Sequence, residues 1–340
     1  MNLQKFIVRT LLKLPDGILV KMSGGKPLAI DGRILDARAQ LLAVQGARQP
    51  SITTLDPVTA RSATSEGLSL LDGAPRSGVE VQPLEVPGPG GPLDARLYLP
   101  AGSTGPLPGL VFFHFGGCVI GDLDTCHTFC SMISDIAGIA VLNVAYRLAP
   151  EHRFPAQVHD AVAAYRWAQG NAEDLRMIPG RIGVGGDSAG GYLSAVVAQE
   201  AKREGFEAPA LQLLIYPVTD APRGTQSYKD FAEGYFLEAE GMDWFWNHYV
   251  LAAGADPKNP YAAPLHADSF SGLPPAYVVT AGFDVLRDEG KAYARSLCPL
   301  APERTIQLAP SLGPHVSCLQ KVFSANQQPP RPPSPRRTRA

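Results

Sequence analysis

Two kinds of hydrophobic pattern alternate along most of this chain. Short apolar runs typical of buried strands occur at residues 107–114, 138–146, 181–187, 211–218 and 274–284. Apolar positions at helical spacing occur between or after them, at residues 154–169, 188–204 and 289–297. Strands that are apolar throughout and separated by helices form a parallel sheet that is covered on both faces. The pattern therefore predicts an α/β fold.

The regions on either side of this alternation have other patterns. Residues 79–86 and 94–100 flank the segment PGPGGP with strand-like alternation, which predicts a hairpin. We expect residues 1–75 to form an N-terminal helical cap region and residues 76–326 to form the main α/β domain. Residues 327–340 are rich in Pro and Arg with almost no apolar content, which predicts a disordered tail.

An aromatic-rich segment at about residues 225–255 interrupts the alternation between two expected strands. We expect it to be helical and to leave the sheet as an excursion. Two interpretations stay open for it. The segment covers the sheet as an ordinary helix, or it joins the N-terminal helices as a lid over the strand ends.

The first residues of the chain contain a further helical pattern, formed by Phe6, Ile7, Leu11, Leu12 and Leu14. We expect a helix packed on the domain, and the alternative is a helix that lies at a lipid interface. Basic residues interrupt each apolar run, so the segment lacks the apolar core of a signal peptide. No run is long enough to span a membrane. We therefore expect a cytoplasmic protein without stable membrane insertion.

Composition places the chain among ordinary globular proteins. It has 340 residues, of which 45% are hydrophobic and 18% charged, and its formal net charge is −2. This charge gives no electrostatic reason to expect nucleic acid as a partner. The five cysteines are an odd and sparse set, which favours reduced thiols over a disulfide framework.

Three of these cysteines, Cys118, Cys126 and Cys130, lie close together with His127 among them. Their spacing matches no standard zinc site, so we expect no metal. A disulfide between Cys126 and either neighbour is an alternative to the reduced, buried thiols that we favour. Cys118 is also an alternative nucleophile, but it lacks the strand-turn-helix setting described next.

The segment GVGGDSAGGYLSA contains the pattern G-x-S-x-G at Gly186 to Gly190, between a predicted strand and a predicted helix. This context is that of a nucleophile elbow, a sharp turn that needs residues without bulk beside the serine. The elbow projects the serine above the sheet, where the helix N-terminus favours developing negative charge. Ser188 is therefore the candidate nucleophile.

A serine nucleophile needs a base and a group that orients the base. In hydrolases with such an elbow, the chain order is Ser, then Asp or Glu, then His. Asp284 lies just past the end of a predicted strand, and His315 is the only histidine beyond it. Order and placement thus select Ser188, Asp284 and His315 as a triad. We expect His266 to be a surface-loop residue and His248 to pack in a helix.

The stretch LVFFHFGGCVIGDLDT breaks from a predicted strand into paired glycines. Attack on an ester carbonyl creates an oxyanion, which backbone N–H groups usually stabilise. We expect the amides of Gly116, Gly117 and Ala189 to be these donors. Glycine is expected because a side chain would occupy substrate space and restrict the backbone. His114 precedes the nucleophile, and we expect it to support the loop by hydrogen bonding.

Several segments together resemble one known family. GRILDARAQLLAV, VIGDLDT, NVAYRLAPEHRFPA, GDSAGG, NPYAAPL and LPPAYVVTAGFDVLRDEG are similar to segments of bacterial hormone-sensitive-lipase-like esterases, family IV, the HGGG/GDSAG branch of the α/β-hydrolases. The resemblance runs from about residue 31 to about residue 294. It implies an α/β-hydrolase fold, with a mostly parallel sheet covered by helices on both faces and a helical cap. It also implies that the segment from Glu151 to Pro155 is structural.

The same resemblance implies an activity. Ser188 would be the nucleophile, Asp284 the acid, and Gly116, Gly117 and Ala189 the oxyanion donors. Family members hydrolyse carboxylic esters of short to medium acyl chains without a cofactor, and a cap shapes the acyl pocket. They commonly dimerise, so a homodimer is consistent with the resemblance.

The chain departs from the family pattern at three places. Phe115 replaces the first glycine of HGGG, which leaves the two glycines used for oxyanion donation. Tyr192 stands where the family often has asparagine. The family's histidine is usually followed by Gly-Phe, whereas His315 lies in GPHVSCLQKVF. One hypothesis is that the reading frame shifts somewhere after residue 296.

These observations predict a serine carboxylesterase that acts through an acyl-enzyme on a small-molecule ester. Two alternatives remain. A catalytically impaired homologue would bind acyl ligands if the altered C-terminal region did not supply the histidine. An amidase or peptidase would use the same fold and the same triad.

Overall fold

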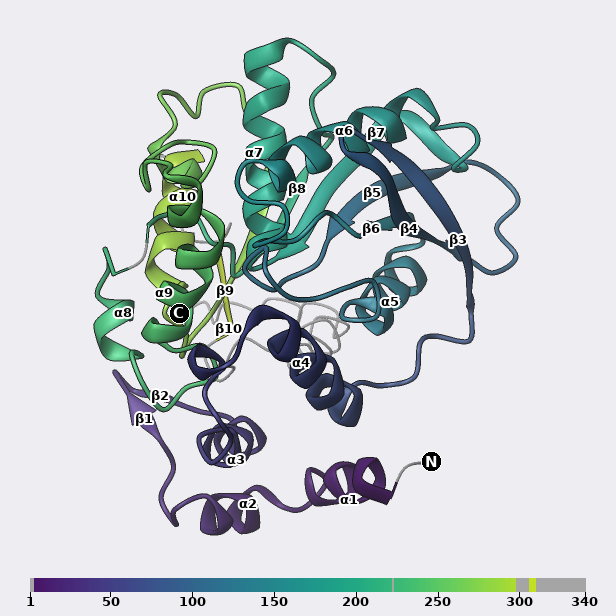
Figure 1. Cartoon of the computed structure of the whole chain (residues 1–340). Coiled ribbons are helices and arrows are strands. Elements are labelled where there is room, and N and C mark those ends of the chain that lie inside the picture. Colours follow the sequence, from purple (N-terminus) through teal and green to yellow (C-terminus); the bar gives the residue numbers. More distant parts are fainter. Residues whose placement is uncertain (1–2, 222, 298–305, 310–340) are drawn as a thin grey trace, which may run out of the picture.

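The computed structural model of the chain describes residues 3–221, 223–297 and 306–309, the last of these by backbone alone. Within these residues, eight strands form one sheet in the order β10-β9-β8-β7-β5-β6-β4-β3 (Figure 1). Their bounds are β3 (Val79–Gly88), β4 (Gly91–Pro100), β5 (Leu107–Phe113), β6 (Ala140–Val144), β7 (Met177–Asp187), β8 (Gln212–Ile215), β9 (Ala276–Ala281) and β10 (Ile306–Ala309). β3 and β4 form the predicted antiparallel hairpin. The six strands β5 to β10 are parallel to one another.

Helices cover both faces of this sheet, as the apolar strands predicted. One face carries α6 (Ala156–Gly170), α7 (Ala189–Glu204) and α10 (Arg287–Leu297), and the other carries α5 (His127–Ala137). The alternation along β5 shows why both faces are apolar. Val111 and Phe113 belong to the core beneath α6 and α7, while Leu110 and Phe112 belong to the core beneath α5.

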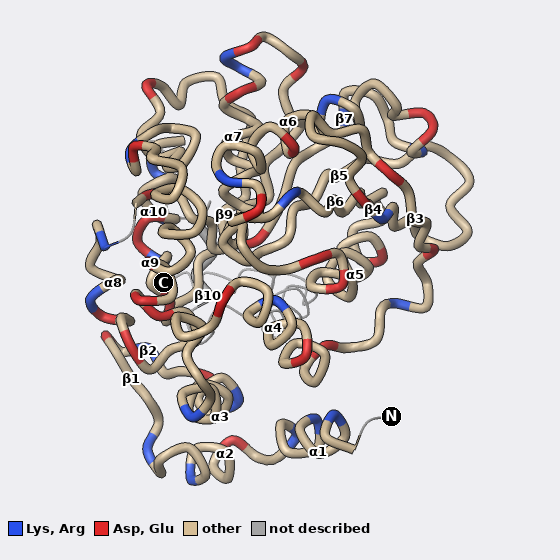
Figure 2. Tube along the Cα trace, in the orientation of Figure 1, with Lys and Arg blue, Asp and Glu red and all other residues tan. Residues whose placement is uncertain are grey.

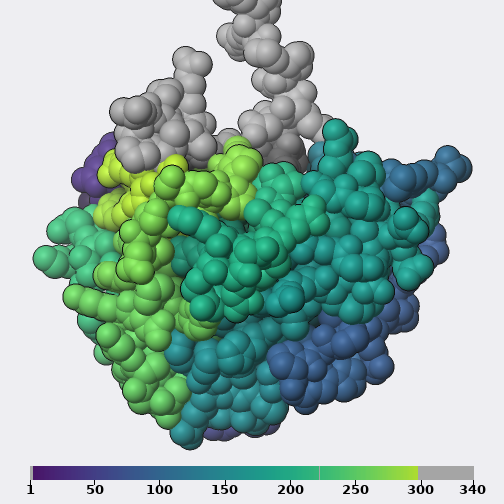
Figure 3. Space-filling model, turned by 90° about the horizontal axis from the view of Figure 1, so that it is seen from above, coloured from purple at the N-terminus to yellow at the C-terminus, as the bar shows by residue number. Residues whose placement is uncertain are grey.

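The N-terminal segment forms a separate group of helices along the lower side of the molecule in Figure 1. Its elements are α1 (Leu3–Leu11), α2 (Asp16–Met22), a small ribbon of β1 (Ala29–Ile30) and β2 (Arg33–Ile34), α3 (Ala37–Gly46), η1 (Ile52–Thr54) and α4 (Pro57–Leu71). Asp36 and Asp56 cap α3 and α4, because each side chain accepts two backbone N–H groups of its helix. From above, little of this segment is visible (Figure 3).

The N-terminal helix α1 contacts α4, as expected for a helix packed on the domain, but only part of its apolar pattern is covered. Leu11, Leu12 and Leu14 pack on a small core beneath α2 and α3. The first turns differ, since Phe6 and Ile7 are about half exposed and α1 has no buried residue. No helix in the described part of the chain has the length and apolar content needed to cross a membrane.

The aromatic-rich excursion lies between β8 and β9. It contains α8 (Ser227–Asp230), α9 (Ala239–Tyr249) and η2 (Leu251–Ala253), and η3 (Pro264–His266) follows it. α9 contacts η1 of the N-terminal segment, so two regions far apart in the sequence meet. The boundaries predicted for the cap and the main domain stay predictions. The tail predicted at residues 327–340 lies outside the described residues.

Charged side chains of both signs are distributed over most elements of the fold (Figure 2). The N-terminal helix α1 differs, because its charged residues, Lys5 and Arg9, are both basic. The net charge of the whole chain therefore differs in sign from the charge of α1.

Candidate active site

Ser188 lies in a sharp turn between β7 and α7. Its backbone has φ +54° and ψ −114°, a strained conformation for a residue with a side chain, and its N–H donates to the Ile215 carbonyl at 2.8 Å. A Cβ on Gly186 would collide with the backbone of Gly190, and one on Gly190 would collide with the Phe113 carbonyl. The small residues around Ser188 are therefore required by the turn itself.

The loop after β5 is held in an unusual backbone conformation by its two glycines. Gly116 has φ +123° and Gly117 has φ +59°, and the Gly116 carbonyl accepts the N–H groups of Val119 and Ile120 at 2.9 Å. A Cβ on Gly116 would collide with the Ile120 carbonyl, and one on Gly117 with the Phe245 ring. The protein's own atoms already occupy the space that a side chain on either glycine would need. The expectation that glycine keeps space free for the substrate was therefore incomplete.

His114 is buried under this loop. Its Nδ1 lies 2.7 Å from the Phe115 carbonyl, and its ring stacks on Tyr146 with a centroid distance of 4.3 Å. The Tyr146 hydroxyl donates to the His114 carbonyl at 2.8 Å. Burial lowers the pKa of His114 to about 4, so its ring is neutral near pH 7. Phe115 itself packs on the core beneath α5.

Asp284 follows β9 and is fully buried. Its Oδ1 accepts the Leu286 N–H at 3.0 Å, whereas its Oδ2 has no hydrogen-bond partner among the described residues. Burial raises the pKa of Asp284 to about 7. Because β7, β8 and β9 are parallel neighbours, Ser188 and Asp284 follow strands that end at the same edge of the sheet.

His315, the predicted base, lies outside the described residues. The chain reaches this region through β10, whose backbone pairs in parallel with β9 from Ile306 to Ala309. β10 therefore also ends at the sheet edge where Asp284 lies. His315 comes six residues after Ala309 in the sequence.

The two other histidines after Ser188 have local partners. His266 Nε2 lies 2.7 Å from Asp220 Oδ1, in a turn near the surface. His248 packs edge-on against Trp244 in α9, at a centroid distance of 4.5 Å. Tyr192, the departure from the family pattern, places its hydroxyl 3.0 Å from that of Tyr249.

A cavity of about 460 Å³, here called the main cavity, joins several of these groups. Ser188, Gly116 and Gly117 line it, together with residues at the end of α3 and residues 234–245 of the excursion. Ala189 lines a smaller neighbouring cavity of about 30 Å³. The structure thus brings the candidate nucleophile and oxyanion loop to one cavity that the N-terminal segment and the excursion both help to form.

The sequence did not predict one buried acid beside the candidate nucleophile. Asp187 accepts the Tyr216 hydroxyl at 3.3 Å and the Cys126 thiol at 3.5 Å, and burial raises its pKa to about 7. In the sequence, only the position of Asp187 directly before Ser188 could have indicated that this acid matters. The burial and the two partners depend on segments far away in the chain.

Cys118, Cys126 and Cys130 are buried free thiols, and burial raises the pKa of each. A raised pKa keeps the thiol protonated near pH 7, which makes Cys118 a poor nucleophile. No group of three or more His, Cys, Asp or Glu side chains in the described residues is arranged to hold a metal ion.

The chain is similar to several known proteins. Residues 110–311 match the model of a family described as alpha/beta hydrolase fold. The chain is 44% identical over 284 residues to the carboxylic ester hydrolase LipN of Mycobacterium tuberculosis, covering 81% of this chain and 75% of that protein. It is 42% identical over 209 residues to an ethyl acetate hydrolase of Pseudomonas putida, covering 60% and 65%.

A solved structure is also similar over most of its length. An ester hydrolase from the metagenome of Lake Arreo, complexed with a derivative of bipyridine phosphonate, superposes with a TM-score of 0.77 at 38% identity. The match covers 84% of this chain and 92% of that one.

Proposed function

The chain belongs to the alpha/beta hydrolase fold family, among the hormone-sensitive-lipase-like esterases, and from this premise we propose that Ser188, Asp284 and His315 carry its reaction. It is a carboxylic ester hydrolase.

Ser188 attacks the ester carbonyl while His315 removes the hydroxyl proton. The amides of Gly116, Gly117 and Ala189 donate to the oxyanion of the tetrahedral intermediate. His315 then gives its proton to the leaving alcohol, which leaves an acyl group on Ser188. Water, activated by the same imidazole, attacks the acyl-enzyme and releases the acid.

The observation that carries this assignment is the buried Oδ2 of Asp284. A carboxylate oxygen without a partner costs free energy unless another group donates to it. An imidazole N–H is such a donor, and its arrival would fix the ring with its other nitrogen toward Ser188. The end of β10 beside β9 supports His315 as the source of this imidazole.

The main cavity supports esters of short to medium acyl chains. Its volume of about 460 Å³ lies at the lower end of the usual range for small-molecule sites. Aromatic and aliphatic side chains of the excursion, among them Phe236, Leu237 and Phe245, line one side of it. The name of the similar ethyl acetate hydrolase is consistent with a short acyl group.

The direct test is hydrolysis of p-nitrophenyl butyrate by the full chain and by Ser188→Ala. We expect the variant to lose at least about a thousandfold in kcat. Ser194→Ala is a matched control, because Ser194 is a buried serine of α7, the helix that follows Ser188, and its hydroxyl donates to the Gly190 carbonyl. Equal turnover by the wild type and Ser188→Ala would refute the assignment. Ester binding without turnover would identify an acyl-ligand-binding homologue instead.

A further inference from the structure

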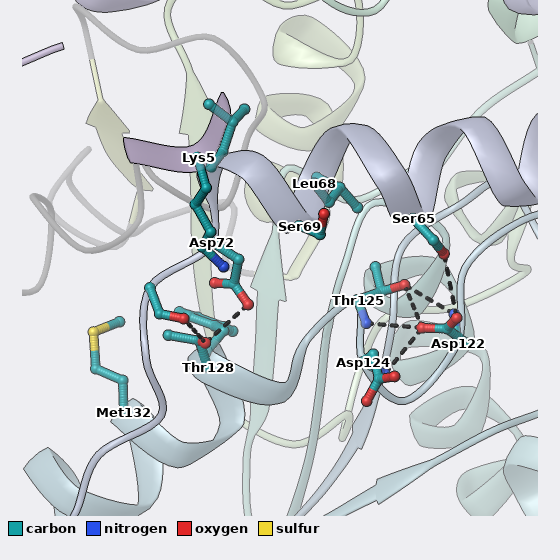
Figure 4. A pocket seen from close by; sticks show the side chains of 13 residues that line it. Lys5, Ser65, Leu68, Ser69, Asp72, Asp122, Asp124, Thr125, Thr128 and Met132 are labelled. Carbon is teal, nitrogen blue, oxygen red and sulfur yellow. Dashed lines mark hydrogen bonds between the residues drawn. The ribbon is translucent and has the colours of Figure 1, made fainter. Parts of the chain in front are cut away.

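Helix α1 turns a charged side toward the protein and an apolar side toward solvent. The Arg9 guanidinium donates to the Asp72 carbonyl. Lys5 lies above the Asp72 carboxylate in a cavity of about 190 Å³ (Figure 4). Burial raises the pKa of Asp72, and the charge of Lys5 acts against this rise. On the other side, Leu3, Phe6 and Ile7 are spaced as one helical stripe and are between 50% and 71% exposed. An ordinary surface helix has the opposite orientation.

Helix α2 also exposes apolar side chains. Ile18 and Met22 lie one turn apart and are each nearly half exposed. Figure 1 shows α1 and α2 as the outermost helices on the lower side of the molecule, outside α3 and α4. We call Leu3, Phe6, Ile7, Ile18 and Met22 the outer stripe. Seven of the twelve large apolar side chains that are exposed in the described residues lie within residues 3–34.

The charges around the outer stripe are mostly basic. Lys13, Lys21 and Lys26 are exposed in the same N-terminal segment. Asp16 is the only acidic residue within residues 3–30, and its carboxylate is bound by Arg38 at 3.0 Å. Exposed apolar side chains and lysines in one segment fit a lipid membrane, which has an apolar interior and negatively charged headgroups at its surface.

We propose that the outer stripe docks on an anionic lipid surface. A second copy of the chain fits less well, because a two-fold contact would bring the same lysines toward one another. The chain's own C-terminal residues 321–340 fit less well too, because they carry five basic residues and no acidic one. The N-terminal side of the molecule then faces the lipid. α3, whose end lines the main cavity, lies directly behind α2.

The test is co-sedimentation of the full chain with vesicles of phosphatidylcholine, with and without phosphatidylglycerol. We expect the wild type to sediment with the anionic vesicles, and Phe6→Ser/Ile7→Ser to lower the partition coefficient at least about tenfold. We expect Lys13→Gln/Lys21→Gln to weaken binding to anionic vesicles, and added salt to do the same. Ile136→Ser is the matched control, because Ile136 is 39% exposed on α5, outside the N-terminal segment.

The outcomes separate the candidate partners. Wild-type protein that binds neither vesicle type overturns the proposal. A wild-type dimer that Phe6→Ser/Ile7→Ser converts to a monomer, without vesicle binding, assigns the outer stripe to a second copy. If Ile136→Ser reduces vesicle binding as much as Phe6→Ser/Ile7→Ser does, the binding is general adhesion. This outcome also overturns the proposal. Hydrolysis of p-nitrophenyl butyrate by each variant confirms folding, since the substituted side chains are exposed, and this readout is independent of lipid binding.

Discussion

The guanidinium of Arg61 in α4 lies 2.6 Å from the carboxylate of Glu151, in the loop before α6. The same guanidinium donates to the carbonyls of Val119 and Ala149 at 2.8 Å. Val119 also donates its N–H to the Gly116 carbonyl. One side chain of the N-terminal segment therefore connects that segment to the turn that contains Gly116 and Gly117.

Loss of Arg61 should reduce both stability and activity. Arg61→Ala leaves two carbonyls without their charged donor, and we expect it to lower the free energy of unfolding by about 2 kcal/mol. We also expect kcat to fall, because the turn after Gly117 loses a support. Urea unfolding and ester kinetics measure both. Arg76→Ala is the control, since Arg76 pairs with Asp135 at 3.6 Å at the exposed surface. Equal effects of the two variants would contradict this role.

The approach of Ile120 to Gly116 predicts a loss of activity in Gly116→Ala. The new Cβ would collide with the Ile120 carbonyl, a backbone atom that cannot rotate away. We expect kcat to fall about a hundredfold or more, as on removal of an oxyanion donor. Gly91→Ala has nearly the same φ, +126°, with nothing near its Cβ, and should keep wild-type kcat. Parallel losses in both variants would mean that φ alone, and not the contact, decides the effect.

The buried Asp187 predicts a pH dependence of stability. Its pKa is about 7 in the folded protein against an ordinary 3.8, so the folded state binds a proton that the unfolded state releases between these values. The stabilisation from this proton is complete below about pH 3.8 and is lost as pH rises through 7. Asp187→Asn removes the buried charge, so we expect its Tm relative to wild type to be higher at pH 8 than at pH 5.

Thermal unfolding at several pH values measures this difference. Asp174→Asn, at an exposed position, should follow the wild type at each pH. A constant offset between Asp187→Asn and the wild type would show that the Asp187 charge does not respond to pH in this range.

Phe245 predicts a change in acyl-chain preference. Its ring lies between the main cavity and the 30 Å³ cavity beside Ala189 and Tyr192, and it lines both. Phe245→Ala joins the two cavities, so we expect kcat/KM for p-nitrophenyl octanoate to rise at least about tenfold relative to the butyrate. Phe236→Ala is the control, because Phe236 lines the main cavity only. The same shift in both variants would mean that cavity width, and not depth, limits the acyl chain.

The predicted base has a test of its own. If His315 removes the Ser188 proton, His315→Ala lowers kcat by about a thousandfold or more, and adding Asp284→Asn lowers it little further. Stopped assays with the single and double variants measure this coupling. His159→Ala, on an exposed face of α6, is the control. Wild-type turnover by His315→Ala would exclude His315 as the base.

Much of the fold follows from local patterns. The apolar runs of β5 to β9 and the helical spacing of α6 and α7 predicted a covered parallel sheet, because burial on two faces leaves no polar positions in a strand. The elbow around Ser188 was predictable for a similar reason, since only small residues fit so tight a turn. The short length of β8 was not predictable, because Tyr216 leaves the strand with φ +35° to reach Asp187.

The sequence by itself determined the α/β class and the strand-turn-helix setting that makes Ser188 the candidate nucleophile. These are properties of neighbours in the chain, which periodicity and turn sterics report directly. Only the tertiary structure decided that Asp284 keeps a buried oxygen unpaired among the described residues, and that Phe245 presses on Gly117. It also decided that α1 faces outward with its apolar side. Each of these depends on which distant segments pack together, because burial removes water and leaves only the protein's own groups as partners.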